Sequence, residues 1–455
     1  MHINTLVVVL YMITLFVMAI VSARRIHSME DYAVSGRSYP AWVIFATLCA
    51  TFVGGGFTMG NAAEVHVHGI VFMLAIAAIS ARELLVAYFI APHMGRFRTA
   101  ISVGDIMRQA YGMPAKIMTG LFAGILCAGI IGIQLRAMGF IFETFFGINQ
   151  TIGILIGCSM VIFYVTLGGF KAVVWTDVLQ FAILALALPV AAILAVYAAG
   201  GPTAMLAALP PDRLDLFAHY SPLAFLSIVA YFLLGEALAP PYIQRLLAGH
   251  SKEVQRAALW AGFAALPLGF VVGLMALATL ALNPASQPNE VVPFIVATVL
   301  PVGIAGFVMA SMLAVIMSSA DSFLNAAAVN LVHDVSKPLF SKQLTSKQEL
   351  WLTQGFTLTL GVASIFFAIS FENLFDAVLV VFGLWAPVVL VPIVAAIRGY
   401  KGNLTVFLTV SLSGLLTSVL WDYHFGIGTE ISGMFLGTCM SLVVFLVLRL
   451  KFKSF

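Results

Sequence analysis

The sequence predicts an all-α integral membrane protein with about 13 transmembrane helices. Of the 455 residues, 62% are hydrophobic and only 9% are charged, which is unlike a soluble globular domain. Apolar segments of about 20 residues, the length needed to cross a hydrocarbon core of about 30 Å, recur along the whole chain. We therefore expect the lipid bilayer to surround the protein, with no soluble domain between the spans.

Short loops connect the predicted spans, and their basic residues predict the orientation. Of the 22 Lys and Arg residues, all but Arg82, Arg136 and Arg213 fall at one side, and cytoplasmic loops accumulate such residues. The N-terminus is therefore expected outside and the C-terminus in the cytoplasm. The net charge of +3 reflects this bias and indicates no nucleic-acid partner. The spans are residues 3–23, 42–67, 70–92, 117–147, 150–168, 173–199, 222–247, 255–282, 291–330, 350–370, 374–397, 403–421 and 428–450.

Two of the spans contain residues that oppose a continuous helix. The glycine triplet 54–56 lies in the middle of the second span, where each glycine costs roughly 1 kcal/mol relative to alanine. The proline pair 240–241 lies in the seventh span, and proline removes a backbone donor and clashes with a preceding carbonyl. Broken helices at equivalent places in two halves of a chain are typical of a transporter binding site.

The two interruptions are five spans apart, which predicts an internal repeat. We expect one extra helix, two five-helix halves of opposite topology, and two C-terminal helices. These units are residues 1–30, 42–199, 222–397 and 403–455.

The ninth span presents hydroxyl groups on one helical face. Ser311, Ser318 and Ser322 are separated by seven and four residues, a spacing that aligns them along an α-helix. Opposite the carbonyls freed near Ala50 and Val53, these hydroxyls would form an all-oxygen shell suited to sodium. The alternative is that each serine bonds back to its own helix.

Two carboxylates also fall within predicted spans. A carboxylate at the centre of a span costs at least about 2.5 kcal/mol on insertion scales, so Asp321 is a functional-site hypothesis. Asp177 begins the sixth span, where it could lie at the level of the lipid head groups. Together the two residues would hold a second cation or share a proton.

Four sequence blocks resemble the sodium:solute symporter family, and among its branches they are most similar to the high-affinity choline transporters. The resemblance covers nearly the full chain. The blocks are ATFVGGGF (residues 50–57), LGGF (167–170) followed by WTDVLQ (175–180), YIQR (242–245) and SSADS (318–322).

This resemblance implies a LeuT-type inverted repeat with Na⁺ as the coupling ion. Carried over by position, the sodium ligands would be the carbonyls of Ala50, Val53 and Val315 and the hydroxyls of Ser318 and Ser319. A second cation site, present in only some relatives, would involve Ser318 together with Asp177, Asp321 and Ser322. The number of sodium ions therefore stays open.

The expected substrate site departs from the choline branch. Choline binding requires aromatic rings around a quaternary ammonium, and that branch has tryptophans where this chain has Phe52, Ile130 and Ala239. Arg136 would instead bind a substrate carboxylate while Glu236 meets an amine, or Arg136 would pair with Glu143 or Glu236. Arg82 and Glu83 carry the same ambiguity, and neighbours on a helix do not face each other. The predicted substrate residues are Phe52, Gly54, Phe57, Gln134, Arg136, Glu236, Ala239 and Tyr242.

The predicted function is sodium-coupled import of a small polar organic solute, an amine, a zwitterion or a carboxylate, across the plasma membrane or a bacterial inner membrane. The first alternative is a proton-coupled or uncoupled carrier with Asp177 and Asp321 as the proton relay. The second is a transporter-like sensor, which would need a separate signalling partner. We expect no enzymatic activity, because no nucleophile–base pair, metal cluster or phosphate loop is visible. We infer no obligate protein partner.

Overall fold

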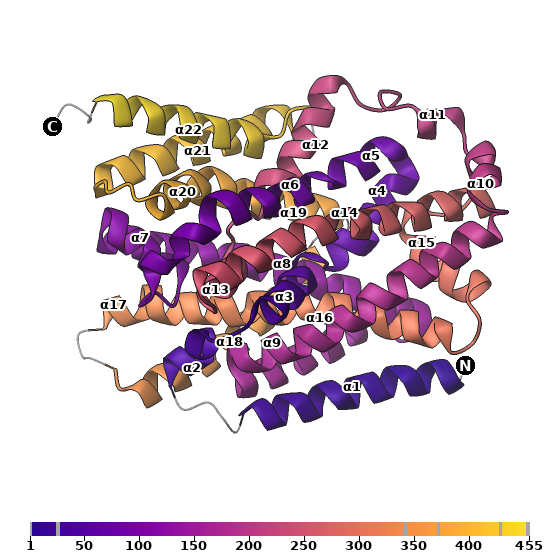
Figure 1. Cartoon of the computed structure of the whole chain (residues 1–455), viewed down its shortest axis with the longest axis horizontal. Helices are drawn as coiled ribbons and strands as arrows, with labels where there is room; N and C mark the ends of the chain where they lie inside the picture. Colours follow the sequence, from indigo (N-terminus) through magenta and orange to yellow (C-terminus); the bar gives the residue numbers. More distant parts are fainter. Residues whose placement is uncertain (1, 24–27, 341–343, 371–373, 427–429, 452–455) are drawn as a thin grey trace.

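The computed structural model describes residues 2–23, 28–340, 344–370, 374–426 and 430–451, and this part of the chain is helical with connecting loops. Long helices lie side by side in a bundle, with the start of α1 and the end of α22 at opposite ends (Figure 1). The α-helices are α1 (His2–Ala23), α2 (Met29–Val34), α3 (Ala41–Phe52), α4 (Asn61–His68), α5 (Ile70–Ile76), α6 (Ala78–Leu85), α7 (Val103–Tyr111), α8 (Met113–Phe146), α9 (Gln150–Ala198), α10 (Pro202–Ala208), α11 (Pro211–Leu214), α12 (Pro222–Leu234), α13 (Pro240–Leu247), α14 (Ser251–Leu282), α15 (Val291–Phe294), α16 (Ile304–Asn330), α17 (Lys337–Leu339), α18 (Ser346–Ser370), α19 (Leu374–Trp385), α20 (Val391–Ile397), α21 (Leu404–Phe425) and α22 (Gly433–Lys451).

Short 3₁₀- and π-helical segments extend or join these helices. They are η1 (Ser35–Arg37), η2 (Gly56–Gly60), η3 (Val86–Ile90), η4 (Ala91–Phe97), η5 (Pro288–Glu290), η6 (Ile295–Val299), η7 (Leu331–Ser336) and η8 (Ala386–Leu390).

The described helices make this a multi-pass membrane protein. Ten of them are long and apolar enough to cross a bilayer, and a bent pair formed by Ala41–Phe52 and Gly56–His68 adds an eleventh. Helix α9 has 49 residues, and at 1.5 Å per residue it would measure roughly 70 Å, more than twice the hydrocarbon thickness. Its one non-helical residue is Gly169 (φ +50°, ψ −157°), which lies between the predicted fifth and sixth spans. The predicted total of 13 spans stays a prediction.

The first broken helix is confirmed, although the break is shorter than predicted. α3 ends at Phe52 and the chain bends by 58° before α4. Val53 leaves the helical conformation (φ −84°, ψ 75°), whereas Gly56 already begins the π-helical turn η2. The turn forms because the backbone N–H and the hydroxyl of Thr58 both donate to Gly54 O, at 2.9 and 3.0 Å.

The second break precedes the proline pair. α12 ends at Leu234 and α13 begins at Pro240, with Leu238 between them in the left-handed region (φ +56°). Pro240 and Pro241 therefore occupy the first turn of α13, where a missing backbone donor costs nothing. The prolines start a new helix and do not kink an existing one.

The predicted ninth span, residues 291–330, begins too early. Residues 291–299 form the short segments α15 and η6, and the long helix α16 starts only at Ile304. Pro301 and Gly303 (φ +91°) interrupt the apolar run, because proline lacks the donor that a helix needs and glycine adopts the left-handed conformation.

Helix α16 forms the centre of the bundle. It packs against α1, α3, α8, α9, α13 and α18, and 89% of its membrane-length segment is buried inside the protein. Its polar residues Ser318, Ser319, Asp321 and Ser322 are almost completely buried, so their hydrogen bonds are made inside the protein.

Candidate functional site

Two serines of α16 lie against the first helix break. Ser318 Oγ is 2.8 Å from Ala50 O and 3.0 Å from Val315 O. Ser319 Oγ donates to Thr51 O at 2.9 Å. Four of the five residues predicted to bind sodium are therefore close to one another, and the fifth, Val53, lies at the break itself.

The chemistry of this oxygen set suits a small hard cation. Carbonyl and hydroxyl oxygens are neutral ligands of the kind that sodium and similar cations accept. The ψ angle of 75° turns the Val53 carbonyl away from the helical ladder, so this oxygen is available to a ligand. The break thus supplies acceptors that an intact helix would have used internally.

A buried ion pair that the sequence analysis missed lies next to these serines. Arg245 of α13 was assigned to the cytoplasmic side, yet its side chain is 0% exposed, and so is that of Asp177. Arg245 Nη2 donates to Asp177 Oδ2 at 2.7 Å and to Ser322 Oγ at 2.5 Å. Arg245 Nε donates to Thr47 Oγ1 at 2.9 Å, and the Thr47 hydroxyl in turn donates to Asp177.

This network changes the interpretation of the residues proposed for a second cation. Asp177 is completely buried inside the protein, and its Oδ1 has no partner among the described residues. Asp321 accepts a hydrogen bond from Tyr164 Oη at 2.8 Å and another from Ser322 Oγ at 3.1 Å. A guanidinium thus already stands between Asp177 and Ser322. The sequence held a signal for Arg245, because this residue falls inside the predicted seventh span, residues 222–247, where a charged side chain needs a partner.

A cavity of about 680 Å³, including the space that opens outward, lies beside the residues predicted to bind sodium. Ser319, one of those residues, lines it, as do Ile130 and Phe323. Five of the eight predicted substrate residues line it: Phe52, Gly54, Phe57, Gln134 and Glu236. The Gln134 side chain is fixed there, because its Oε1 accepts a hydrogen bond from Gly55 N at 2.8 Å.

The charged part of the cavity wall is formed by Glu236 and Arg82, and the sequence analysis had left open whether Arg82 binds substrate or pairs structurally. Arg82 Nη1 donates to Glu236 Oε1 at 3.0 Å, and Arg82 Nε donates to Glu83 Oε1 at 3.0 Å. The expectation that Arg82 and Glu83 do not face each other is therefore wrong, because their long side chains turn toward one another. Tyr242 Oη also donates to Glu236 Oε1, at 2.8 Å, and the Arg82 guanidinium lies 5.3 Å from the centre of the Tyr242 ring.

Arg136 and Ala239 lie elsewhere. Arg136 Nη1 donates to Ala368 O on α18 at 3.1 Å, and neither Arg136 nor Ala239 lines the cavity. The 3.6-residue helical period separates Gln134 and Arg136 by about 200° around α8. Gln134 faces the cavity, so Arg136 faces a different neighbour.

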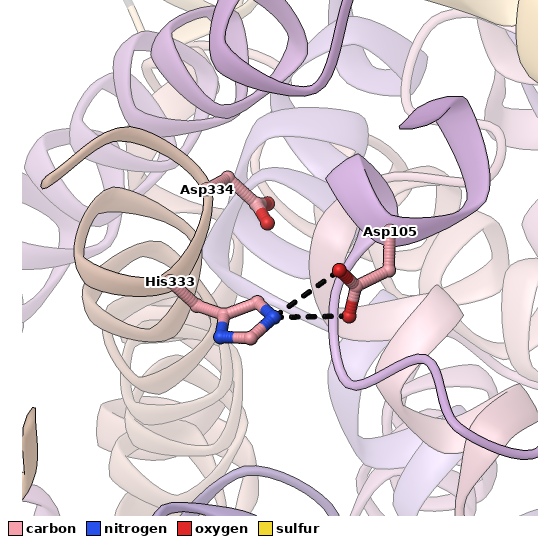
Figure 2. A group of neighbouring side chains, drawn as sticks. All are labelled: Asp105, His333 and Asp334. Carbon is pink, nitrogen blue, oxygen red and sulfur yellow. Dashed lines mark hydrogen bonds and ion pairs between the residues drawn. The ribbon is translucent and has the colours of Figure 1, made fainter. Parts of the chain in front are cut away.

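A second polar cluster lies near the end of the bundle that holds α7 and α17. Figure 2 shows the His333 ring directed at Asp105, with Asp334 beside it; His333 Nε2 is 3.1 Å from both Asp105 carboxylate oxygens. Lys116 Nζ lies 2.6 Å from Asp105 Oδ1 and 3.4 Å from Asp334 Oδ1. The lysine ammonium therefore occupies the place between the carboxylates where a metal ion would have to bind.

The electrostatics of this cluster agree with a structural role. Burial alone would raise the pKa of the Asp105 carboxyl, but hydrogen bonds and charges from His333 and Lys116 outweigh burial and hold that pKa well below its usual value. Asp105 is thus a permanent anion that ties α7 to α8 and η7.

A bundle of membrane-length helices, with two broken helices and a cavity beside the first break, has the architecture of a secondary transporter. The family model of the sodium:solute symporter family matches residues 32–405 of the chain, and the chain therefore belongs to this family. The family predicted from the four sequence blocks is therefore confirmed, and members of this class are transporters of small organic solutes.

Known proteins resemble the chain over most of its length. It is 27% identical over 369 residues to the high-affinity proline transporter PutP of Bacillus subtilis, covering 77% of both chains. It is 25% identical over 413 residues to the high-affinity choline transporter 1 of Drosophila melanogaster, covering 83% of this chain but only 63% of that one. The solved structure of a Na⁺-coupled sialic acid symporter, in a substrate-bound outward-open state, has a TM-score of 0.85 at 18% identity and covers 100% of this chain and 98% of that chain. This likeness shows a shared fold.

Proposed function

We propose that the protein is a sodium-coupled secondary symporter that imports a small polar organic solute by alternating access. The observation that carries the proposal is the contact of Ser318 Oγ with Ala50 O across the first helix break. Relatives described as carriers of proline and choline, and a structural neighbour described as Na⁺-coupled, support it. The plasma membrane, or the inner membrane of a bacterium, is the proposed location.

The proposed sodium ligands are the carbonyls of Ala50, Val53 and Val315 and the hydroxyls of Ser318 and Ser319. A cation there would hold α16 against the broken helix that also forms part of the cavity wall through Phe52 and Gly54. Sodium would thus raise the affinity for the solute, and by linkage the solute would raise the affinity for sodium by the same factor.

We assign the chain 13 spans in an inverted-repeat arrangement, with the N-terminus outside. Dividing α9 at Gly169 and joining α12 to α13 adds two spans to the eleven described above. Units 42–199 and 222–397 then each begin with a broken helix, which supports their equivalence.

The first test measures whether sodium stabilises the purified protein without any solute. Raising NaCl at constant ionic strength, with KCl as the balance, is expected to raise the apparent melting temperature, because a ligand that binds only the folded state stabilises it by about 2.7 kcal/mol at 100 times its Kd. Ser319→Ala should require roughly ten times more sodium for the same shift, because it removes one of the proposed oxygen ligands, and a tenfold change in affinity corresponds to about 1.4 kcal/mol. Equal shifts of the apparent melting temperature in sodium and in potassium would rule out the proposed sodium site and favour the proton-coupled alternative.

We propose a single sodium ion per solute, because the Arg245 guanidinium already binds Asp177 and Ser322. At saturating sodium, one bound ion adds about 1.4 kcal/mol of stability per tenfold rise in concentration, and two ions add twice as much. A slope near 1.4 kcal/mol in the same melting series is the expected result. A slope near 2.8 kcal/mol would require Arg245 to leave Asp177 and admit a second ion.

A further inference from the structure

Two buried donors in the cavity wall lack a hydrogen-bond partner among the described residues. They are Arg82 Nη2 and Asn61 Nδ2, on side chains that are 4% and 3% exposed, and both residues line the cavity. A buried donor without an acceptor is costly, more so when it is charged. A solute that brings two acceptor oxygens into the cavity would satisfy both donors.

An acceptor for a solute lies beside these donors. The Glu236 side chain is 17% exposed and lines the cavity, while its Oε1 already accepts from Arg82 and Tyr242. Glu83 also pairs with Arg82, so the three charged groups carry one positive and two negative charges when ionised. Of the described residues that line the cavity, Arg82 and Glu236 are the charged ones. Glu83 does not line it but adds a second negative charge through its contact with Arg82.

We propose that the cavity binds a zwitterion of the α-amino or imino acid type, with its carboxylate on Arg82 and Asn61 and its ammonium on Glu236. This assignment rests on the proposed function and narrows its substrate class. Arg82 Nε and Nη1 already donate to Glu83 and Glu236, so the free Nη2 and Asn61 Nδ2 would each donate to one oxygen of the carboxylate. Glu236, whose Oε1 lies 3.0 Å from Arg82 Nη1, supplies the opposite charge. Glu83 and Glu236 together outnumber Arg82, so the site attracts a cation more than an anion. We therefore expect an amine to bind more weakly than the zwitterion, and a carboxylate to bind more weakly still.

The rest of the cavity wall favours an apolar body on that zwitterion. Phe52, Phe57, Ile130, Ile133 and Phe382 line it, and the Phe52 and Phe57 ring centres are 6.0 Å apart. A further charged group on the body of the zwitterion would lie against these apolar groups with no opposite charge beside it.

The test compares matched solutes on the full-length protein in saturating sodium, with the shift in melting temperature as the measure. The first series is proline, pyrrolidine and cyclopentanecarboxylate, and the second is phenylalanine, phenethylamine and 3-phenylpropanoate. In at least one series, the zwitterion should bind at least tenfold more tightly than the amine and the amine more tightly than the carboxylate. A carboxylate that binds best in both series, or no stabilisation by any of the six while sodium still stabilises, overturns the assignment and leaves the sodium-coupled function standing.

Two variants separately test how the protein binds the ammonium and the carboxylate of the solute. Glu236→Gln should weaken the zwitterion and the amine at least tenfold and strengthen the carboxylate, which reverses the order of the last two. Asn61→Ala should weaken the zwitterion and the carboxylate but leave the amine unchanged. Glu143→Gln, at an exposed position on α8, is the matched control and should keep the original order. If Glu236→Gln keeps the original order of affinities for zwitterion, amine and carboxylate, the assignment is overturned. If that variant does not fold, the solute series on the unmodified protein serves as the test.

Discussion

Replacing Arg245 by methionine is expected to lower the free energy of unfolding by about 3–5 kcal/mol, the largest stability effect of any single change considered for this protein. Methionine keeps much of the side-chain volume but removes the guanidinium that binds Asp177, Ser322 and Thr47. The Asp177 carboxylate then stays buried without its cation, and that uncompensated charge accounts for most of the loss. The apparent melting temperature in detergent and the yield of folded protein measure the effect.

A double variant separates the lost charge balance from lost packing. Asp177→Asn combined with Arg245→Met removes both charges, and it should recover most of the stability, because a neutral pair costs less to bury than a single charge. Arg256→Met is the control: Arg256 is 64% exposed and paired with Glu253 on the same helix, so its loss should change stability by less than about 0.5 kcal/mol. A double variant as unstable as Arg245→Met would show that the guanidinium acts through packing and not through Asp177.

Replacing Gly54 by alanine is expected to weaken both sodium-dependent stabilisation and solute binding strongly. A methyl group there would lie 2.6 Å from Ser319 Oγ and 2.8 Å from Gln134 Nε2. Both side chains must move, which removes one proposed sodium ligand and disturbs the cavity wall in a single step. We expect the sodium concentration needed for half of the melting shift to rise at least tenfold.

The control for Gly54→Ala is the same change where space is open. Gly355 lies in the exposed face of α18, and no atom lies within 4 Å of the added carbon. Gly355→Ala should keep the sodium response and raise stability slightly, by up to about 1 kcal/mol, since alanine is the better helix former. A normal sodium response in Gly54→Ala would mean that the cation does not bind beside Ser319.

Much of the arrangement around the helix break could be predicted from local sequence. Glycine and proline interrupt helices wherever they occur, and the spacing of Ser318 and Ser322 places them on one face of α16, so the break and the hydroxyl face followed from short-range rules. The start of α16 at Ile304 was missed, because an apolar run continues through Pro301 and hides the interruption. Whether the oxygens of this face bind sodium stays a prediction.

The charged residues show what the sequence alone could not decide. Composition and the recurrence of apolar segments determined the class of protein, because crossing a bilayer requires a fixed length of apolar helix. The tertiary structure decided that Arg82 and not Arg136 faces the cavity, and that Arg245, assigned from the sequence to the cytoplasmic side, is buried against Asp177. These outcomes depend on how helices from distant parts of the chain rotate and approach one another, since a charge inside a membrane protein is stable only beside a partner that another helix supplies.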